Sequence, residues 1–436
     1  MKKLIFFWKE LLTTFWFLPL LIIGSAVLLS IGLVSLDHSI TIKQDGLIRF
    51  FLVNSSDSAR SILTTISGAM IGVAGTVFSV TLVALTLASS QFGPRLIRNF
   101  MYVRLNQVVL GSYIATFLYC LLVLNSIEGS DDYKFIPIFS VLVASLATII
   151  NIILLIIFIH QIAVSIQADN VVSDISEFIA KQIETLFPEK MGEENEEDEV
   201  DISAAMSAFP NRIFINSPKC GYLQFISSEA LINVVSEQDA LLSLYHRPGS
   251  YLVKGMKMGE LLTHSKWEEE KTDSILSQFI IGKTKTSQQD LEFSIHQMVE
   301  IAARALSPGV NDPYTAIACI DNLTSTLSYL TQAKFPSKYR LDEEGNLRIV
   351  ADILDFEGVL DAAFNPIRQF SGGNPSVIIR LMEALTVIQE FTQIESRRKA
   401  VIKHAKMVLN IGKQTIKEKN DLEDLRERAS KILEDE

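Results

Sequence analysis

Four long apolar runs, separated by short polar segments, occupy the first part of the chain. They cover about residues 15–36, 66–88, 105–127 and 135–159, and none contains Asp, Glu, Lys or Arg. A helix rises about 1.5 Å per residue, so runs of this length can cross a hydrocarbon core of about 30 Å. The pattern therefore predicts four transmembrane helices in a membrane domain over residues 1–162.

Charges in the short connections predict how these helices are oriented. Lysines precede the first run and arginines fill the segment 91–104, whereas the connection 128–134 is acidic with one lysine. Cationic loops favour the cytoplasmic side, so both termini are expected there. The first run is longer than the apolar part of a signal peptide and is followed by Asp37-His38, so we expect a retained anchor.

Small and hydroxyl-bearing residues recur along the second run at steps of three and four, which places them on one helix face. The helix is expected to begin with Ser56 or Asp57 as its cap and to stop near Gly93-Pro94. The face comprises Gly68, Gly72, Gly75, Thr76, Ser79, Thr86 and Ser90. Two interpretations stay open: close helix packing, as in a Gly-x-x-x-Gly motif, or the lining of a water-filled path in an oligomer.

Polar residues flank this face at both ends. Arg60 and Thr64 continue it by steps of four, and Arg95 and Arg98 follow its other end. If the face lines a path, these four residues lie at the two mouths.

The lack of ionisable residues in the four runs argues against proton-coupled or sodium-coupled transport, which usually needs one at membrane depth. Asn151 is expected to bond to another helix and His160 to lie at the membrane interface. Apolar positions continue at helical spacing to Leu186, which predicts a helical stalk over 163–188. An acidic linker follows at 189–210, and it has no spaced ligand pattern for calcium.

The segment 211–265 is predicted to be a small β-rich subdomain. Strands are expected over 212–216, 221–227, 241–246 and 249–255, with a short helix over 228–236. Gly221-Tyr222-Leu223 and the Pro248–Gly255 segment resemble the barrel-sandwich pattern of lipoyl and biotinyl modules. Met256-Lys257-Met258 copies a biotinylation tripeptide but lacks its hairpin context, so we expect no modification there.

The segment 266–436 is predicted to be a helical subdomain, with a hairpin near 340–348 and a final charged helix that protrudes. The fold class is therefore an α-helical membrane protein with four transmembrane helices and a cytoplasmic α+β domain. That domain is expected to contain a small β-barrel-like part and a helical part.

Two polar groups in the helical subdomain are candidates for chemistry. Arg304, Ser307, Asn311 and Asp312 surround a break rich in proline and glycine, which is either an ordered joint between helices or a ligand-binding or gating loop. Glu292, His296 and Glu300 stand one helical turn apart, a spacing that suits a divalent cation. We favour a polar helix face and expect no metal site.

Composition disfavours several function classes. The three cysteines lack metal or redox spacing, and the chain has no Walker loop, Rossmann fingerprint or nucleophile elbow. A net charge of −11 makes nucleic acid an unsuitable partner. We expect neither enzymatic activity nor a cofactor.

A family resemblance is carried by four segments: Phe78-Ser79, Ala88–Arg95, Arg304–Pro313 and Thr315-Ala316. Over nearly its whole length the chain resembles the bacterial predicted-membrane-protein family called domain of unknown function 2254. The resemblance implies a location in the bacterial inner membrane and no particular activity. His296 departs from the pattern expected there, which further weakens the metal hypothesis.

Two functions fit these observations. In the first, a homo-oligomer packs the second helices around an axis as an ion path, with the cytoplasmic domain as gate or collar. Flanking arginines favour anions, although Asp57 beside Arg60 reduces that preference. In the second, the helices anchor a cytoplasmic sensor or scaffold that conducts nothing. The expected partners are the lipid bilayer, further copies of the chain, and a small ion or ligand.

Overall fold

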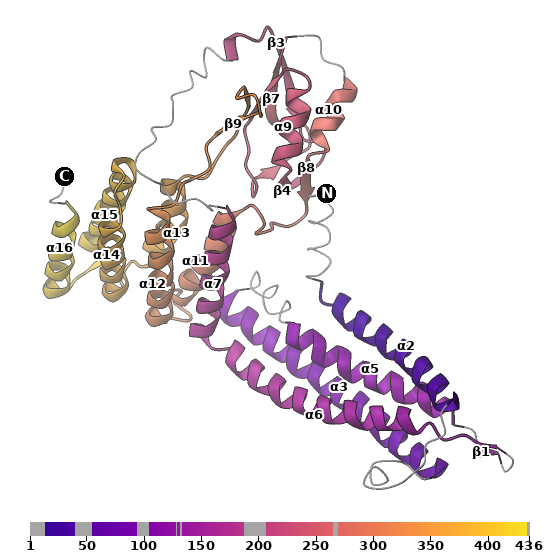
Figure 1. The fold of residues 1–436 in the computed structure, drawn as a ribbon. Helices are drawn as coiled ribbons and strands as arrows, with labels where there is room; N and C mark the ends of the chain where they lie inside the picture. Colours follow the sequence, from indigo (N-terminus) through magenta and orange to yellow (C-terminus); the bar gives the residue numbers. More distant parts are fainter. Residues whose placement is uncertain are drawn as a thin grey trace. The chain divides into compact units, whose positions relative to one another are not determined.

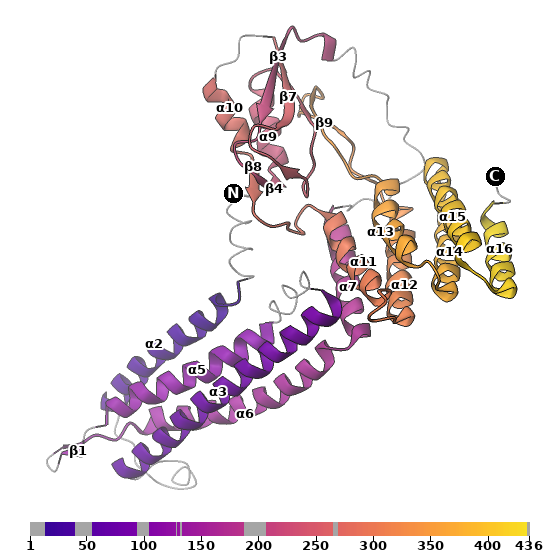
Figure 2. The same ribbon diagram turned by 180° about the vertical axis from the view of Figure 1, so that it is seen from behind.

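The computed structural model describes residues 14–39, 55–93, 104–127, 129–130, 133–186, 206–264 and 269–433. The chain divides into two compact units, Met1–Asn170 and Val171–Glu436. We call them the N-terminal unit and the C-terminal unit, and Figures 1 and 2 show the elements of each.

Within the described residues, four helices are long and apolar enough to cross a membrane, and all lie in the N-terminal unit. They are α2 (Phe17–Ser39), α3 (Ser56–Phe92), α5 (Arg104–Asn125) and α6 (Ile138–Ser165). α5 packs against α2, α3 and α6, and it is the most buried of the four. The four predicted membrane helices are therefore confirmed as elements, with α3 and α6 longer than their apolar runs.

The start of α3 differs by one residue from the expectation. Ser55, rather than Ser56 or Asp57, is the N-cap, and its hydroxyl accepts a hydrogen bond from Ser58 N at 3.1 Å. Ser55 has extended backbone angles, which lets its side chain reach the free amides of the first turn.

Several polar groups inside the helix bundle, centred on Asn151, are bonded to one another. Asn151 of α6 donates from Nδ2 to Thr116 Oγ1 at 2.8 Å and accepts at Oδ1 from Ser112 Oγ at 2.6 Å. The backbone carbonyl of Asn151 accepts a hydrogen bond from the Tyr113 hydroxyl at 2.7 Å. The expected bond from Asn151 to another helix is confirmed, and it links α6 to α5.

A carboxylate ties the end of α2 to the start of α6. Asp37 accepts hydrogen bonds from the backbone amides of Phe139 and Ser140 at 2.9 and 3.0 Å, and from Ser140 Oγ at 2.7 Å. The His38 ring stacks on Phe135, with ring centroids 3.7 Å apart. Asp37 thus satisfies free amides at a helix N-terminus, where a negative charge is also favoured.

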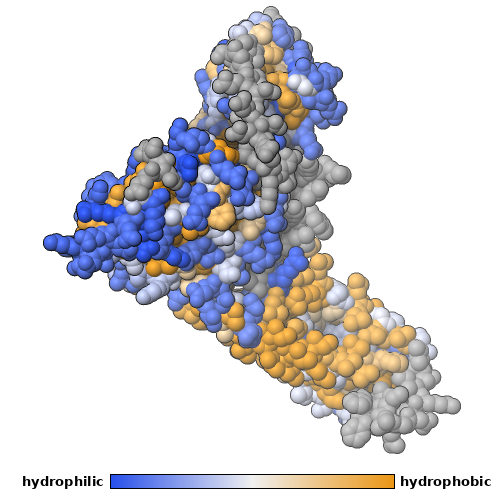
Figure 3. Space-filling view, turned by 60° about the vertical axis from the view of Figure 1, so that its left-hand side comes forward, coloured by the Kyte–Doolittle hydropathy of each residue, from blue (hydrophilic) through white to orange (hydrophobic). Residues whose placement is uncertain are grey.

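The outer surface of the N-terminal unit is apolar. Figure 3 shows hydrophobic side chains gathered over its helices, whereas the visible face of the C-terminal unit is mostly hydrophilic. Ile150, Ile153 and Ile156 of α6 are among the large side chains left exposed. A contiguous apolar surface of this kind suits contact with lipid.

The predicted stalk is two helices rather than one continuous helix. α6 ends at Ser165 and α7 (Ala168–Leu186) begins after Ile166-Gln167. The apolar residues of α7, among them Ile175, Ile179 and Ile183, are buried. Gln182 bonds to the carbonyl of Ser287 and to the hydroxyl of Ser294, so α7 is tied into the C-terminal unit.

The C-terminal unit combines two sheets with nine helices in its described part, α7 included. The strands are β3 (Asn211–Asn216), β4 (Gly221–Ile226), β5 (Leu241–Leu244), β6 (Tyr251–Leu252), β7 (Lys257–Thr263), β8 (Phe279–Gly282), β9 (Tyr339–Leu341) and β10 (Leu347–Val350). The other helices are α9 (Ser228–Ser236), α10 (Glu269–Leu276), α11 (Leu291–Ala305), α12 (Pro313–Leu330), α13 (Phe356–Phe370), α14 (Pro375–Glu390), α15 (Glu395–Thr415) and α16 (Lys419–Leu433).

The β part is assembled from distant segments. Its sheets have the strand orders β3-β7-β5-β10-β9 and β6-β4-β8, and they share a hydrophobic core with α9 and α10. The described strands do not close into a barrel, so the barrel-like expectation is not supported. The expectation of helices throughout residues 266–436 was wrong for β8, since β4 supplies antiparallel partners for Phe279–Gly282.

The predicted hairpin near residues 340–348 is confirmed as β9–β10, and β10 joins the larger sheet in parallel with β5. Arg348 holds this hairpin by donating to Asp342 and Asp239, each at 2.7 Å. The last helix does not protrude, because α16 buries Leu425, Ala429 and Ile432 and packs on α14 and α15.

A buried carboxylate lies where the turn before β6 meets the start of α11. Asp290 is the N-cap of α11 and accepts from Phe293 N at 2.9 Å, with Lys285 Nζ at 3.9 Å. A Cβ at Gly249 would lie only 2.2 Å from Asp290 Oδ2, so this turn needs a glycine, which also has φ +96°. Burial raises the pKa of Asp290 to about 6, although the Phe293 amide and Lys285 oppose the shift.

We expect Asp37→Ala to destabilise the N-terminal unit by about 1 kcal/mol, because it removes the acceptor for two amides at the start of α6. Asp37→Asn retains one acceptor and should lose less. Thermal unfolding of the purified protein in detergent measures both effects. An unchanged midpoint for Asp37→Ala would contradict the capping role.

Asp290 should make the C-terminal unit less stable as pH rises. Its folded-state pKa, about 6, lies above its ordinary value, so the folded protein binds more protons between about pH 4 and 6. Asp290→Asn keeps the cap and removes the charge, so it should stabilise the unit at pH 7 by on the order of 1 kcal/mol. The unfolding midpoints of the wild type and Asp290→Asn should differ most near about pH 7.5 and approach one another as pH falls towards the ordinary pKa of 3.8. A difference that stays constant down to about pH 4 would contradict this assignment.

Candidate functional site

The small-residue face of α3 points away from the rest of the N-terminal unit. The packed side of α3 includes Leu63, Met70, Val77 and Ala84, all buried. At 3.6 residues per turn, the predicted face lies on the opposite side of the helix. All of its members are exposed, namely Gly68, Gly72, Gly75, Thr76, Ser79, Thr86 and Ser90.

Each glycine of this face opens onto free space. A Cβ built at Gly68, Gly72 or Gly75 would meet no described atom within 4 Å. Within the described residues, no other helix therefore packs on this face. Of the two interpretations, close packing would need a partner outside these residues.

The hydroxyls of the face are already bonded within α3. Thr76 donates to Gly72 O at 3.3 Å, Ser79 to Gly75 O at 2.9 Å, and Thr86 to Leu82 O at 2.8 Å. Ser90 likewise donates to Leu87 O at 2.8 Å. The donors are thus satisfied within the helix, while each hydroxyl oxygen can still accept a hydrogen bond from outside.

The proposed mouth residues are only partly described. Arg60 and Thr64 are exposed, and Arg60 Nη2 donates to Ile127 O at 2.9 Å after the end of α5. The start of α3 thus carries a positive charge held by the bundle. Arg95 and Arg98 lie outside the described residues.

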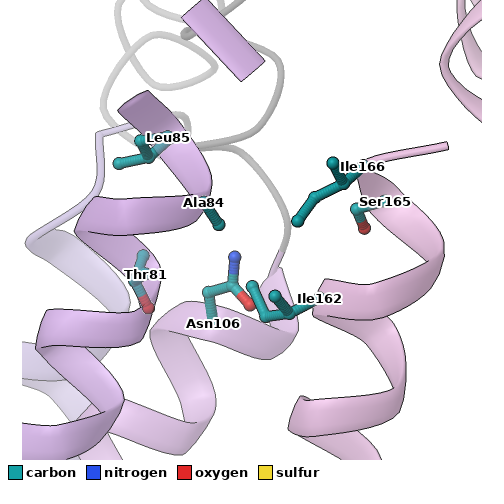
Figure 4. A pocket seen from close by; sticks show the side chains of 7 residues that line it. All are labelled: Thr81, Ala84, Leu85, Asn106, Ile162, Ser165 and Ile166. Carbon is teal, nitrogen blue, oxygen red and sulfur yellow. The ribbon is translucent and has the colours of Figure 1, made fainter. Parts of the chain in front are cut away.

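A small cavity lies on the packed side of α3, where sequence reasoning placed no site. Figure 4 shows side chains of α3, α5 and α6 around it. It has a volume of about 10 Å³ and is lined by Thr81, Ala84, Leu85, Asn106, Ile162, Ser165 and Ile166. Asn106 is 7 % exposed, and its Oδ1 has no hydrogen-bond partner among the described residues. The space matches one water molecule, which such a buried oxygen can bind.

The break after α11 is an ordered joint between helices. Ser307 Oγ donates to Arg304 O at 2.6 Å, and Asp312 N donates to Ala305 O at 2.8 Å. Asp312 caps α12 by accepting from Thr315 N at 3.1 Å and from Thr315 Oγ1 at 2.5 Å. These bonds give Ser307 and Asp312 structural roles, so their presence in the loop needs no ligand.

Asn311 adopts the left-handed backbone region in this joint, with φ +52°. Asparagine tolerates that region better than most residues, which explains its position before the cap. Tyr314, in the first turn of α12, is 81 % exposed. The structure thus brings Arg304, Ser307, Asn311 and Asp312 into one joint.

The Glu292, His296 and Glu300 series does not form a metal site. Arg247 Nη2 donates to Glu292 at 2.9 Å, and His296 Nε2 is 4.0 Å from Glu292. Among the described residues, no three His, Cys, Asp or Glu side chains are placed to hold a metal ion. Glu292 and His296 are half-buried rather than fully exposed, since the face is partly covered.

Comparison with known proteins gives one family and several relatives. Residues 13–387 match the family model described as "Predicted membrane protein (DUF2254)". The uncharacterized protein Rv1290c of Mycobacterium tuberculosis is 30 % identical over 412 residues, covering 93 % of this chain and 77 % of that protein. The uncharacterized protein Mb1321c of Mycobacterium bovis matches with the same identity and coverage. No solved structure matches the chain.

Proposed function

The chain belongs to the DUF2254 family of predicted membrane proteins, and from that premise we propose that copies of it assemble around α3 as an ion path across the bilayer. The proposal places the protein in the bacterial inner membrane, with both termini and the C-terminal unit in the cytoplasm. The C-terminal unit would then act as a gate or an assembly collar.

The open face of α3 is the observation that carries this proposal. Small residues give helices a means of close approach, but they gain nothing from facing acyl chains. A symmetric oligomer supplies a matching surface, because the same face of another copy is also small and open. Contact around an axis would bring together the glycines and hydroxyls of several copies.

The chemistry of the face suits a path that holds water and ions. Hydroxyl oxygens and glycine backbone are tolerated next to water and disfavoured next to lipid. The segment between Thr64 and Ser90 contains no ionisable residue that could trap a passing ion. Arg60 near one mouth, with Arg95 and Arg98 near the other, favours anions over cations, although Asp57 lies beside Arg60.

A second candidate is a membrane-anchored sensor or scaffold that conducts nothing. It is favoured by the hydrogen bonds of Thr76, Ser79, Thr86 and Ser90 to their own helix, since hydroxyls satisfied in this way do not need water. In that case the same faces would meet in a dry helix contact, and the C-terminal unit would carry the function.

Planar-bilayer recording of the purified protein separates these candidates. Ser79→Leu places a bulky side chain at the middle of the face and should reduce conductance about tenfold or more, because it narrows a path lined by hydroxyls. Phe78→Trp also adds volume to the exposed surface of α3, but about 100° around the helix from Ser79, and it should leave conductance unchanged.

Assembly is measured separately from conduction. Gly72→Cys should form a disulfide between copies under mild oxidation, whether or not the contact between their α3 helices contains water. If Gly72→Cys forms this cross-link while the wild-type protein carries no current, the anchor is supported. Absence of both the current and the cross-link would exclude the proposed assembly through α3.

A further inference from the structure

A cleft between α12 and α14 in the C-terminal unit has no role in the proposed ion path. Its volume is about 590 Å³, within the range of about 300 to 1,000 Å³ that is typical of small-molecule sites. One face of each helix lines it: Asp321, Thr324, Ser325, Ser328, Tyr329 and Gln332 from α12 and the turn after it, and Arg380, Glu383, Ala384, Val387 and Phe391 from α14 and its C-cap.

One end of the cleft is lined by charged side chains that form ion pairs with one another. Arg380 Nε donates to Asp321 at 2.6 Å and its Nη1 donates to Glu383 at 2.8 Å. Arg428 of α16 also donates to Glu383. The bonds to Asp321 and Glu383 raise the pKa of Arg380, so its guanidinium is fully charged and already paired.

This pairing selects against an anionic ligand. A phosphate or carboxylate would face two carboxylates and would have to displace them from Arg380, at the cost of leaving them unpaired. Arg380 binds Asp321 through Oδ1, which leaves Oδ2 to accept a hydrogen bond from a ligand hydroxyl or amine.

The other end of the cleft is apolar and exposed. Tyr329, Val387 and Phe391 keep 38 %, 39 % and 45 % of their surface exposed. Two aromatic rings and a branched side chain at one end of a cleft suit the flat face of a ring.

A hydroxyl without a partner lies in the wall between these ends. Ser328 is 9 % exposed, and its Oγ has no hydrogen-bond partner among the described residues. Thr324, one turn earlier, donates to Ile320 O at 2.7 Å in the way expected of a hydroxyl on a helix. Less than 1 Å² of this oxygen is accessible, so Ser328 lies behind the surface of the cleft, and contacts to a ligand come from the side chains at the two ends.

We propose that this cleft binds an uncharged nucleoside-like molecule, with its ring on Phe391, Tyr329 and Val387 and its hydroxyls toward Asp321. From Asp321 to Tyr329 the helix rises about 12 Å, a span too long for a single ring and suited to a ring joined to a sugar. A carboxylate accepts hydrogen bonds from vicinal ribose hydroxyls, as it does in dinucleotide sites. The amide of Gln332 is placed at the apolar end, where it can bond to a ring edge.

The test uses the full chain in lipid nanodiscs and measures binding of adenosine, guanosine, cytidine and uridine by saturation-transfer NMR. At least one nucleoside should bind the wild type, and Phe391→Ala or Asp321→Asn should weaken it about tenfold. Phe370→Ala is the matched control, because Phe370 is also an exposed phenylalanine but lies outside the cleft. Adenosine monophosphate should bind less tightly than adenosine.

If Phe391→Ala does not fold, Ser325→Trp fills the cleft from an exposed position on α12 and should abolish binding instead. The proposal fails if no nucleoside binds, if Phe370→Ala and Phe391→Ala weaken binding equally, or if the monophosphate binds more tightly than adenosine. The nucleoside proposal does not depend on conduction through α3. Bilayer recordings test the ion path and the NMR binding measurements test the cleft, so either proposal can fail without the other.

Discussion

The hydrogen-bonding demand of the backbone and polar side chains in hydrocarbon governs the N-terminal unit. With no water at membrane depth, each polar group needs a partner in its own helix or in a neighbouring one. Asn151 meets this demand through Thr116, Ser112 and Tyr113 of α5. The hydroxyls of α3 meet it by bonding to the preceding turn, and Asp37 meets it for the first amides of α6.

The same demand makes the open side of α3 informative. Its hydroxyls are satisfied locally, so the helix is stable with this face uncovered, yet its three glycines give up contacts that a larger side chain would make. The opposite side of α3 packs on its own bundle through Met70, Val77 and other apolar residues. A helix with one packed side and one small, uncovered side is suited to a second association step between copies.

The C-terminal unit follows a different principle, since its stability comes from apolar burial between elements that are far apart in sequence. The two sheets combine strands β3 to β7 with strands β8 to β10, which come later in the sequence. Arg348 of β10 donates a hydrogen bond to Asp239 and so holds this last strand in place. The α12–α14 cleft retains exposed aromatic residues beside a paired ionic cluster, and the stability of the unit does not require that exposure.

The sequence by itself determined the features that depend on near neighbours. Uninterrupted apolar runs specified four membrane helices, and Gly93-Pro94 marked where the second of them ends. Steps of three and four residues also placed the small residues of α3 on one face. The family resemblance required only the linear motifs.

Tertiary structure decided everything that depends on a distant partner. Leu276, Phe279 and Ile280 fit helical spacing, yet Phe279–Gly282 is a strand, because β4 supplies it with antiparallel partners. Periodicity gathered Gly68, Gly72 and Gly75 on one face, but only the positions of α5 and α6 decided that this face points outward. The cleft needed α12 and α14 side by side, since residues about 60 positions apart meet only after folding. Local patterns fix the faces of helices, and packing fixes what each face meets.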